Sequence, residues 1–117
     1  MSARNRLTEL CMGLPEVTAT PVGDGHVQFA VRGRTFAYFL DDHHGDGITA
    51  LHCKAGPGEN AQLAGDEPTV FHLPSYLATR GWVGMRLDDP PPDWDRVESL
   101  VVGSYRLIAP KRLVARL

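Results

Sequence analysis

A chain of 117 residues fits one domain, residues 1–117, with a single hydrophobic core, and a domain of this size needs neither a metal nor a disulfide to fold. Its apolar fraction of 43% and charged fraction of 22% are ordinary for a globular protein. The formal net charge of −2 argues against an extended nucleic-acid surface, because phosphate binding depends on clustered Lys and Arg.

The first half of the chain predicts one helix followed by several strands. Leu7, Leu10, Cys11 and Leu14 recur at helical spacing, and Pro15 supplies the stop. Alternating or β-branched segments then follow one another, separated by glycine-containing turns, and together they predict a meander of three or four antiparallel strands. These strands are expected at residues 17–22, 27–31, 35–40 and 48–54.

The second half predicts further strands and a long C-terminal helix. Asp93 or Asp95 is expected to cap this helix, and Asp95 with Glu98 resembles a capping box. Gly103, in mid-helix, is expected to allow a close backbone approach. The pattern indicates an α+β fold, an antiparallel meander of about five to six strands with helices packed on one face. The other expected elements are a short helix at 59–64, a short strand at 69–72 and a strand at 82–87.

The chain carries no sign of membrane insertion or export. No apolar run approaches the ~20 residues that a membrane span needs, and the polar start MSARNRLTELCMGL does not fit a signal peptide. We therefore expect a cytoplasmic protein. Cys11 and Cys53 are expected as buried thiols, because two lone cysteines make neither a disulfide framework nor a zinc site.

The stretch LDDHHGDGITALHCK, residues 40–54, holds three of the five histidines. His43 and His44, with Asp42 and Asp46, are the candidates for metal ligands. Their spacing matches no recognised zinc motif, and Asp, His and Gly suit the geometry of a turn. A plain hairpin loop is therefore the favoured interpretation, and we expect no metal and no other cofactor.

One face of the predicted sheet offers a candidate binding surface. Trp82 is expected to lie on the face opposite the apolar residues of its strand. It would either cover the far side of the sheet or, with His72 and Tyr76, form an exposed surface for a ligand, a protein partner or a second copy of the chain. His52 is expected to point away from Cys53, so it need not join the loop that carries the other histidines.

No arrangement of residues in the sequence indicates an enzyme. The chain lacks a Gly-x-Ser-x-Gly elbow, and its paired carboxylates fall in solvated turns. Ser104 and Tyr105 lie in the last helix, where Ser104 is expected to pack and the Tyr105 hydroxyl to reach a partner. We therefore expect no catalytic residue and a non-enzymatic protein.

Charge is unevenly distributed along the chain. Residues 41–67 hold six acids and one base, whereas residues 99–117 hold four bases and no acid. The bases near the C-terminus either complement the end of the last helix or form a patch for nucleic acid or an acidic partner. Two arginines beside a hairpin turn would add to that patch if the fold brings them near. The candidate residues are Arg32, Arg34, Arg106, Lys111, Arg112 and Arg116.

Five motifs occur in an order that resembles the MmcQ/YjbR family of small bacterial proteins. They are LCMGLPEVT (10–18), VQFAVRGRTFA (27–37), LHCK (51–54), GWVGMRLD (81–88) and VGSYRLIAPKRL (102–113). The resemblance covers nearly the whole chain and implies a compact domain similar to type III secretion chaperones. It implies no enzymatic activity, and it suggests DNA binding through the sheet and loops.

This chain departs from the family in its acidic middle, where many relatives carry more Lys. The sequence therefore leaves two alternative hypotheses for the function. The first is DNA binding through the basic residues. The second is binding of a protein, a second copy or a small ligand by the sheet face around Trp82 and Tyr76.

Overall fold

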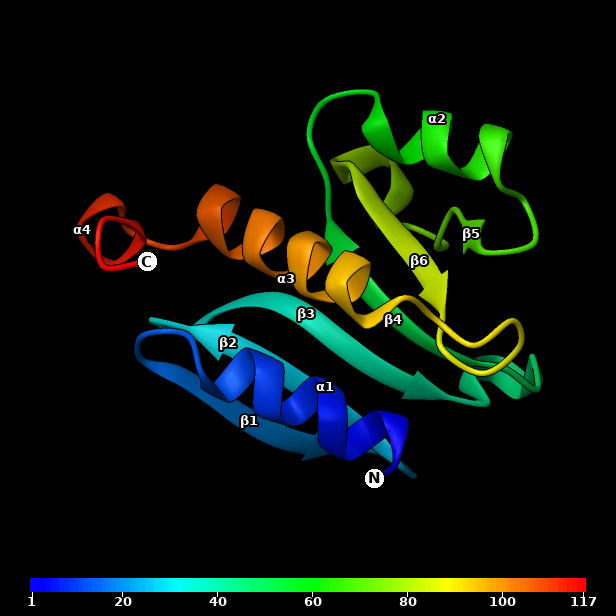
Figure 1. Ribbon diagram of the computed structural model, residues 1–117, viewed down its shortest axis with the longest axis horizontal. Helices are drawn as coiled ribbons and strands as arrows, with labels where there is room; N and C mark the ends of the chain where they lie inside the picture. The colour runs from blue at the N-terminus through cyan, green and yellow to red at the C-terminus, as the bar shows by residue number, and fades with distance from the viewer.

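A computed structural model describes residues 1–117 and shows a six-stranded antiparallel sheet with helices packed against it (Figure 1). The strand order is β1-β2-β3-β4-β6-β5. The first four strands form the predicted meander, but β5 lies outside β6 at the edge of the sheet, because the chain leaves the sheet after β4. The strands are β1 (Val17–Val22), β2 (His26–Val31), β3 (Arg34–Asp41), β4 (Thr49–Lys54), β5 (Phe71–His72) and β6 (Trp82–Arg86).

Four α-helices and two 3₁₀ turns complete the α+β fold. Ser2 caps the first helix by accepting a hydrogen bond from Asn5 N–H, and Asp93 caps the long C-terminal helix through Asp95 N–H. The expected capping box between Asp95 and Glu98 does not form, because the cap lies two residues earlier. These elements are α1 (Ala3–Met12), η1 (His43–Gly45), α2 (Glu59–Asp66), η2 (Ala78–Arg80), α3 (Trp94–Ile108) and α4 (Lys111–Val114). None of these helices combines the length and the apolar character that crossing a membrane requires.

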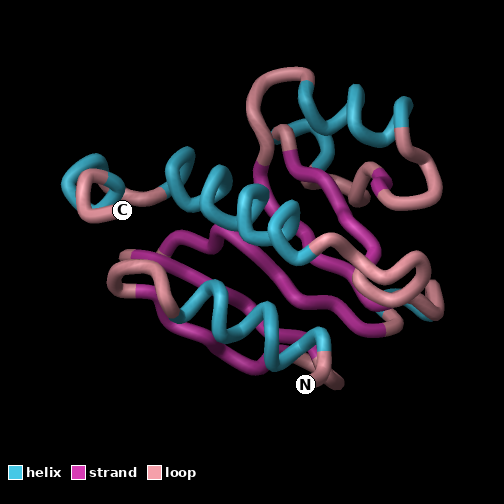
Figure 2. Tube along the Cα trace, viewed as in Figure 1, coloured by secondary structure: helices cyan, strands magenta, loops and turns pink.

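The core lies between the sheet and the helices α1 and α3, which run in front of the strands in Figure 2. Helix α3 contacts β3 and β4, and α1 contacts β1. Strand residues that face these helices, such as Phe29, Leu51 and Val83, are completely buried. The opposite face of the sheet carries no long helix, so it is the face on which a binding site can open.

Ser104 and Tyr105 fasten α3 to the sheet, as predicted for a packing serine and a core tyrosine. The Ser104 hydroxyl donates to the carbonyl of Phe36 at 2.6 Å and accepts from the N–H of Lys54 at 3.0 Å. The Tyr105 hydroxyl donates to the carbonyl of Pro15 at 2.7 Å. The prediction for Gly103 was wrong, since a Cβ there would meet no atom within 4 Å.

A β-bulge in β3 decides which side chains face away from the helices. Phe29 pairs with Ala37 and Ala30 pairs with Thr35, so Phe36 is an extra residue in the strand. The Phe36 ring meets Tyr105 of α3 edge to face, with centroids 5.5 Å apart. Beyond the bulge the usual alternation resumes and turns Tyr38 toward the open face of the sheet.

Candidate functional site

The open face of the sheet is hollowed into a pocket of about 640 Å³. All five histidines of the chain line it, although they are spread over 47 positions of the sequence from His26 to His72. We call it the histidine pocket. Its lining residues are Val22, Gly23, His26, Tyr38, Leu40, His43, His44, Asp46, His52, His72, Leu73, Pro74, Ser75, Tyr76 and Leu77.

Sheet register brings two of these histidines together across a glycine. His52 of β4 and His72 of β5 both pair with Gly84 of the intervening strand β6. Two residues separated by a whole strand have Cα atoms about 10 Å apart. Their rings meet nevertheless, with the two Nε2 atoms 3.0 Å apart. Gly84 makes this possible, because a Cβ there would lie 2.1 Å from His72 Nε2.

The His52–His72 contact is a hydrogen bond between neutral rings. One Nε2 must carry the shared proton and the other must accept it. Burial lowers the pKa of His52 to about 4, with the charges of neighbouring His72 and His43 acting in the same direction. Burial also lowers the pKa of His72, although Asp46 opposes the shift. At neutral pH the pair therefore contributes no net positive charge to the pocket.

His26 and His43 connect the first hairpin to the loop after β3. The backbone N–H of Asp41 donates to His26 Nδ1 at 3.0 Å, so the proton of this imidazole sits on Nε2. The rings of His26 and His43 have centroids 5.5 Å apart, and those of His43 and His44 lie 3.8 Å apart. Burial and the two neighbouring histidines lower the pKa of His43.

The loop that carries His43 and His44 is a short 3₁₀ turn held by two aspartates. Asp42 Oδ1 accepts from Gly47 N–H at 2.7 Å, and Asp46 Oδ1 accepts from Ile48 N–H at 3.0 Å. The turn is therefore built by polar contacts within the hairpin, as the sequence predicted. The structure contains no group of three or more His, Cys, Asp or Glu side chains placed to hold a metal ion.

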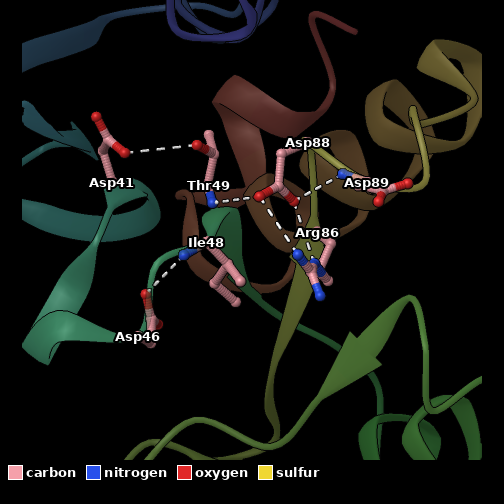
Figure 3. A network of polar contacts seen from close by, with 7 residues as sticks. All are labelled: Asp41, Asp46, Ile48, Thr49, Arg86, Asp88 and Asp89. Atoms are coloured by element: carbon pink, nitrogen blue, oxygen red, sulfur yellow. Dashed lines mark hydrogen bonds and ion pairs between the residues drawn. The ribbon is translucent and has the colours of Figure 1, made fainter.

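A network of polar contacts supports this loop from the neighbouring strands (Figure 3). Asp88 accepts from Thr49 N–H at 3.2 Å, from Asp89 N–H at 2.8 Å and from Arg86 Nε at 3.1 Å. Burial opposes the ionisation of Asp88, but these hydrogen bonds outweigh it and lower the pKa to about 2. Asp88 thereby ties the end of β6 to the start of β4, directly after the loop that holds Asp46.

The outer wall of the pocket is the segment after β5, and Tyr76 stands at its rim. This side chain is 92% exposed, and its φ of 66° is left-handed, a conformation that bulky residues rarely adopt. Thr79 Oγ1 donates to the Tyr76 carbonyl at 3.1 Å, and Leu77 N–H donates to the Ser75 carbonyl at 2.7 Å. The fold thus holds an unburied aromatic ring at the mouth of the pocket.

The three predicted surface residues lie in different environments. His72 and Tyr76 line the pocket, as expected for a ligand surface. Trp82 lies on the expected face and only 6% of it is exposed, so it covers that side of the sheet, and its assignment to an exposed surface was wrong. Its ring packs against Tyr38 of the pocket wall, with centroids 5.9 Å apart.

The sequence interpretation missed part of the histidine pocket. His52 faces away from Cys53 as predicted, but it lines the same pocket as the loop histidines, and His26 was overlooked. The local alternation of β2 and β4 indicated which way each ring points. Only the pairing of β5 with β6 shows that His72 reaches the same place.

The basic candidates gather at the other end of β3. Arg32 binds Glu16 with a contact of 2.6 Å, and Arg116 approaches the same carboxylate at 3.9 Å. The Arg34 guanidinium donates to the Ile108 carbonyl at the end of α3, at 3.3 Å. The fold therefore brings the hairpin arginines to the C-terminal helices, as the patch interpretation required. We call this set the basic end: Arg32, Arg34, Arg106, Lys111, Arg112 and Arg116.

The chain matches one family model and is similar to a solved structure. Residues 12–107 match the family model YjbR. The crystal structure of Deinococcus radiodurans protein DR2400, with the family domain DUF419, is similar to this chain, with 27% sequence identity and a TM-score of 0.71. That similarity covers 91% of this chain and 78% of the other. No curated protein matches the chain.

Proposed function

The chain belongs to the YjbR family, as its five motifs predicted, and we propose that it is a non-enzymatic domain that binds a small molecule in the histidine pocket. The observation that carries the proposal is the convergence of all five histidines and an exposed tyrosine on one hollow of about 640 Å³. Small-molecule sites are concave, largely apolar and about 300–1,000 Å³ in volume, with a few polar groups that orient the ligand.

The strain and the exposure in the pocket wall support a binding role. Of the five non-glycine residues with a left-handed φ, Asp42, His44 and Tyr76 belong to the two segments that border the pocket, and the other two, Glu16 and Arg32, lie at the basic end. Such conformations cost about 1–3 kcal/mol each and cluster at binding sites. An exposed ring such as Tyr76 adds nothing to the core, so its placement is consistent with contact to a ligand.

The two cysteine thiols lie outside the pocket, which favours binding over covalent catalysis. Cys11 and Cys53 are buried in the core between the sheet and the helices. Burial raises the pKa of the Cys53 thiol to about 12 and raises the pKa of Cys11 further. Neither would form a thiolate nucleophile near neutral pH. We further propose that the protein works in the cytoplasm, where such thiols stay reduced.

The proposal is tested by titrating the ¹⁵N-labelled full chain with a library of small aromatic and aliphatic fragments, followed by NMR. Fragments that bind should shift the amide signals of His72, Tyr76 and Leu77. Tyr76→Ser should weaken binding, whereas Leu107→Ser, which removes an exposed apolar side chain from α3, should not. The idea fails if no fragment shifts these signals, or if Tyr76→Ser and Leu107→Ser weaken binding equally.

A second candidate function is nucleic-acid binding at the basic end. The specific observation is that the fold brings Arg32 of the β2–β3 turn, Arg112 of α4 and Arg116 around Glu16, whose pKa is lowered by the hydrogen bond from Arg32 and by the charges of Arg32, Arg116 and Arg112. Two features count against it. The Glu16 carboxylate occupies Arg32, and the chain as a whole is acidic, with a net charge of −2.

Salt dependence separates this second candidate from the first. If the basic end binds DNA, affinity for a labelled duplex should fall steeply with salt, with a log–log slope of about −0.9 per neutralised phosphate. The double variant Lys111→Ala/Arg112→Ala should bind less well than Arg4→Ala/Arg80→Ala, which removes the same charge from other exposed positions. Absence of binding at low salt, or equal loss in both variants, would remove nucleic acid from consideration.

A further inference from the structure

Resting on the proposed function, we infer that the histidine pocket recognises an uncharged, flat heteroaromatic molecule of one or two rings, with hydrogen-bond donors and acceptors on its edge. The inference depends on three properties of the pocket wall: the absence of fixed positive charge, the density of rings, and the mixture of imidazole donors and acceptors. Each property limits the ligand in a different way.

The pocket wall lacks the fixed positive charge that would favour an anionic ligand. Among the fifteen lining residues there is no Lys or Arg and one carboxylate, Asp46. The nearby Arg86 is already held by Asp88, through its Nε and Nη2 atoms. A phosphate or carboxylate would therefore lose its hydration without meeting a fixed cation, which is unfavourable. The lowered pKa values of His43, His52 and His72 keep these rings neutral near pH 7, so they also offer no positive charge to an anion.

Rings dominate the wall and favour a flat ligand. Five histidines and two tyrosines, Tyr38 and Tyr76, make up nearly half of the fifteen lining residues. Aromatic rings prefer offset-stacked or edge-to-face contacts with other rings. Tyr38 already uses one side for Trp82, whereas the Tyr76 ring is 92% exposed and free to cover a ligand. A flat ring inserted beneath Tyr76 would make contacts that an aliphatic chain of equal size would not.

The imidazole edges offer both donors and acceptors. Because His52 and His72 share one proton between their Nε2 atoms, one of their Nδ1 atoms carries a proton and the other does not. Every completely buried polar side-chain atom in the protein has a partner, so these unpaired Nδ1 atoms are not completely buried. His26 adds an Nε2–H donor, since Asp41 N–H occupies its Nδ1. A ring nitrogen together with an amide or amino group would match such a set.

Four probes of nearly the same size separate these requirements. Nicotinamide is neutral and aromatic, nicotinate is its anionic counterpart, 1-methylnicotinamide is cationic, and cyclohexanecarboxamide is neutral but not aromatic. Each is titrated into the ¹⁵N-labelled full chain at pH 7.5. We expect nicotinamide to bind with a Kd on the order of millimolar, as suits so small a ligand. It should bind at least tenfold more tightly than each of the other three.

Matched variants locate the contact. Tyr76→Phe keeps the ring and should retain nicotinamide binding within about twofold, whereas Tyr76→Leu keeps only the apolar bulk and should weaken it at least threefold. Equal or tighter binding of nicotinate, 1-methylnicotinamide or cyclohexanecarboxamide overturns the inference. If library fragments shift the pocket signals but nicotinamide does not, the inference is wrong and the proposed function stands. If no fragment shifts them, both are wrong.

Discussion

Gly84 has no Cβ, and a Cβ at this position would collide with the ring of His72. The imidazoles of His52 and His72 therefore lean over β6 and meet, although a strand separates them. Gly84 has an ordinary strand conformation, so its importance lies in the space above it. At the scale of single residues, this glycine explains how two strand histidines come into contact.

Gly84→Ala is expected to reduce the free energy of unfolding by about 1–3 kcal/mol, because the His72 ring must leave its position to admit the methyl group. Gly103→Ala is the matched control, since its methyl group enters open space in a helix and should stabilise the protein by about 0.5–1 kcal/mol. Urea denaturation measures both changes. Equal effects of the two substitutions would show that the space above Gly84 is not needed.

His52 is expected to make the protein sensitive to mild acid. Its pKa is about 4 in the folded state, against about 6.5 for an exposed histidine, so the unfolded chain binds its proton first as the pH falls. The contribution of the neutral His52 ring to the free energy of unfolding is complete above pH 6.5 and is lost between about pH 6.5 and pH 4. For this mostly buried group it amounts to about 2–3 kcal/mol.

Urea denaturation at pH 7.5 and at pH 4.5 tests this dependence. His52→Gln, which cannot titrate, should lose less stability between the two pH values than the natural chain. His44→Gln, a change in the exposed loop, should follow the natural chain. Parallel losses in the natural chain and in His52→Gln would contradict the assignment.

At the scale of elements, a single hydroxyl joins α3 to the two central strands. Ser104 donates to β3 through the Phe36 carbonyl and accepts from the N–H of Lys54, the last residue of β4. The bulge at Phe36 brings that carbonyl within reach of the helix. Helix, bulge and strand end are thus fixed to one another, and the opposite face of the same two strands carries Tyr38 and His52 of the pocket.

Ser104→Ala should lower the free energy of unfolding by about 1–3 kcal/mol, because it leaves the Lys54 N–H without a partner inside the protein. Ser99→Ala, an exposed serine in the same helix, should change stability by less than about 0.5 kcal/mol. Thermal denaturation followed by circular dichroism compares the two variants. A loss no larger in Ser104→Ala than in the control would show that this hydroxyl does not fasten the helix.

At the scale of the whole molecule, the pocket lies between a firmly held wall and a weakly held one. Strands β3 and β4 pair on both sides and lie under α3, so they form the rigid wall. The other wall follows β5, a strand of two residues at the edge of the sheet. The basic end lies elsewhere, beside the β2–β3 turn, so each candidate function is assigned to a separate part of the surface (Figure 1).

Hydrogen exchange should reveal this difference between the walls. The amides of Phe39 and Leu51, in the central strands, are expected to exchange only through global unfolding. Those of His72 and Leu77 should exchange faster, through local opening of the outer segment. Addition of a fragment that binds the pocket should slow exchange at Leu77 more than at Leu51. Uniform protection across both walls would contradict a pocket with an adjustable outer side.

Local regularities in the sequence determined the elements, the α+β class and the family. Alternation correctly oriented His52 and Trp82, since the direction of a strand side chain depends only on its own strand. The tertiary structure alone decided that Trp82 is buried against Tyr38 and that five histidines share one pocket. Those outcomes depend on strand order and register, which are set by contacts between residues far apart in the chain, and no local pattern encodes them.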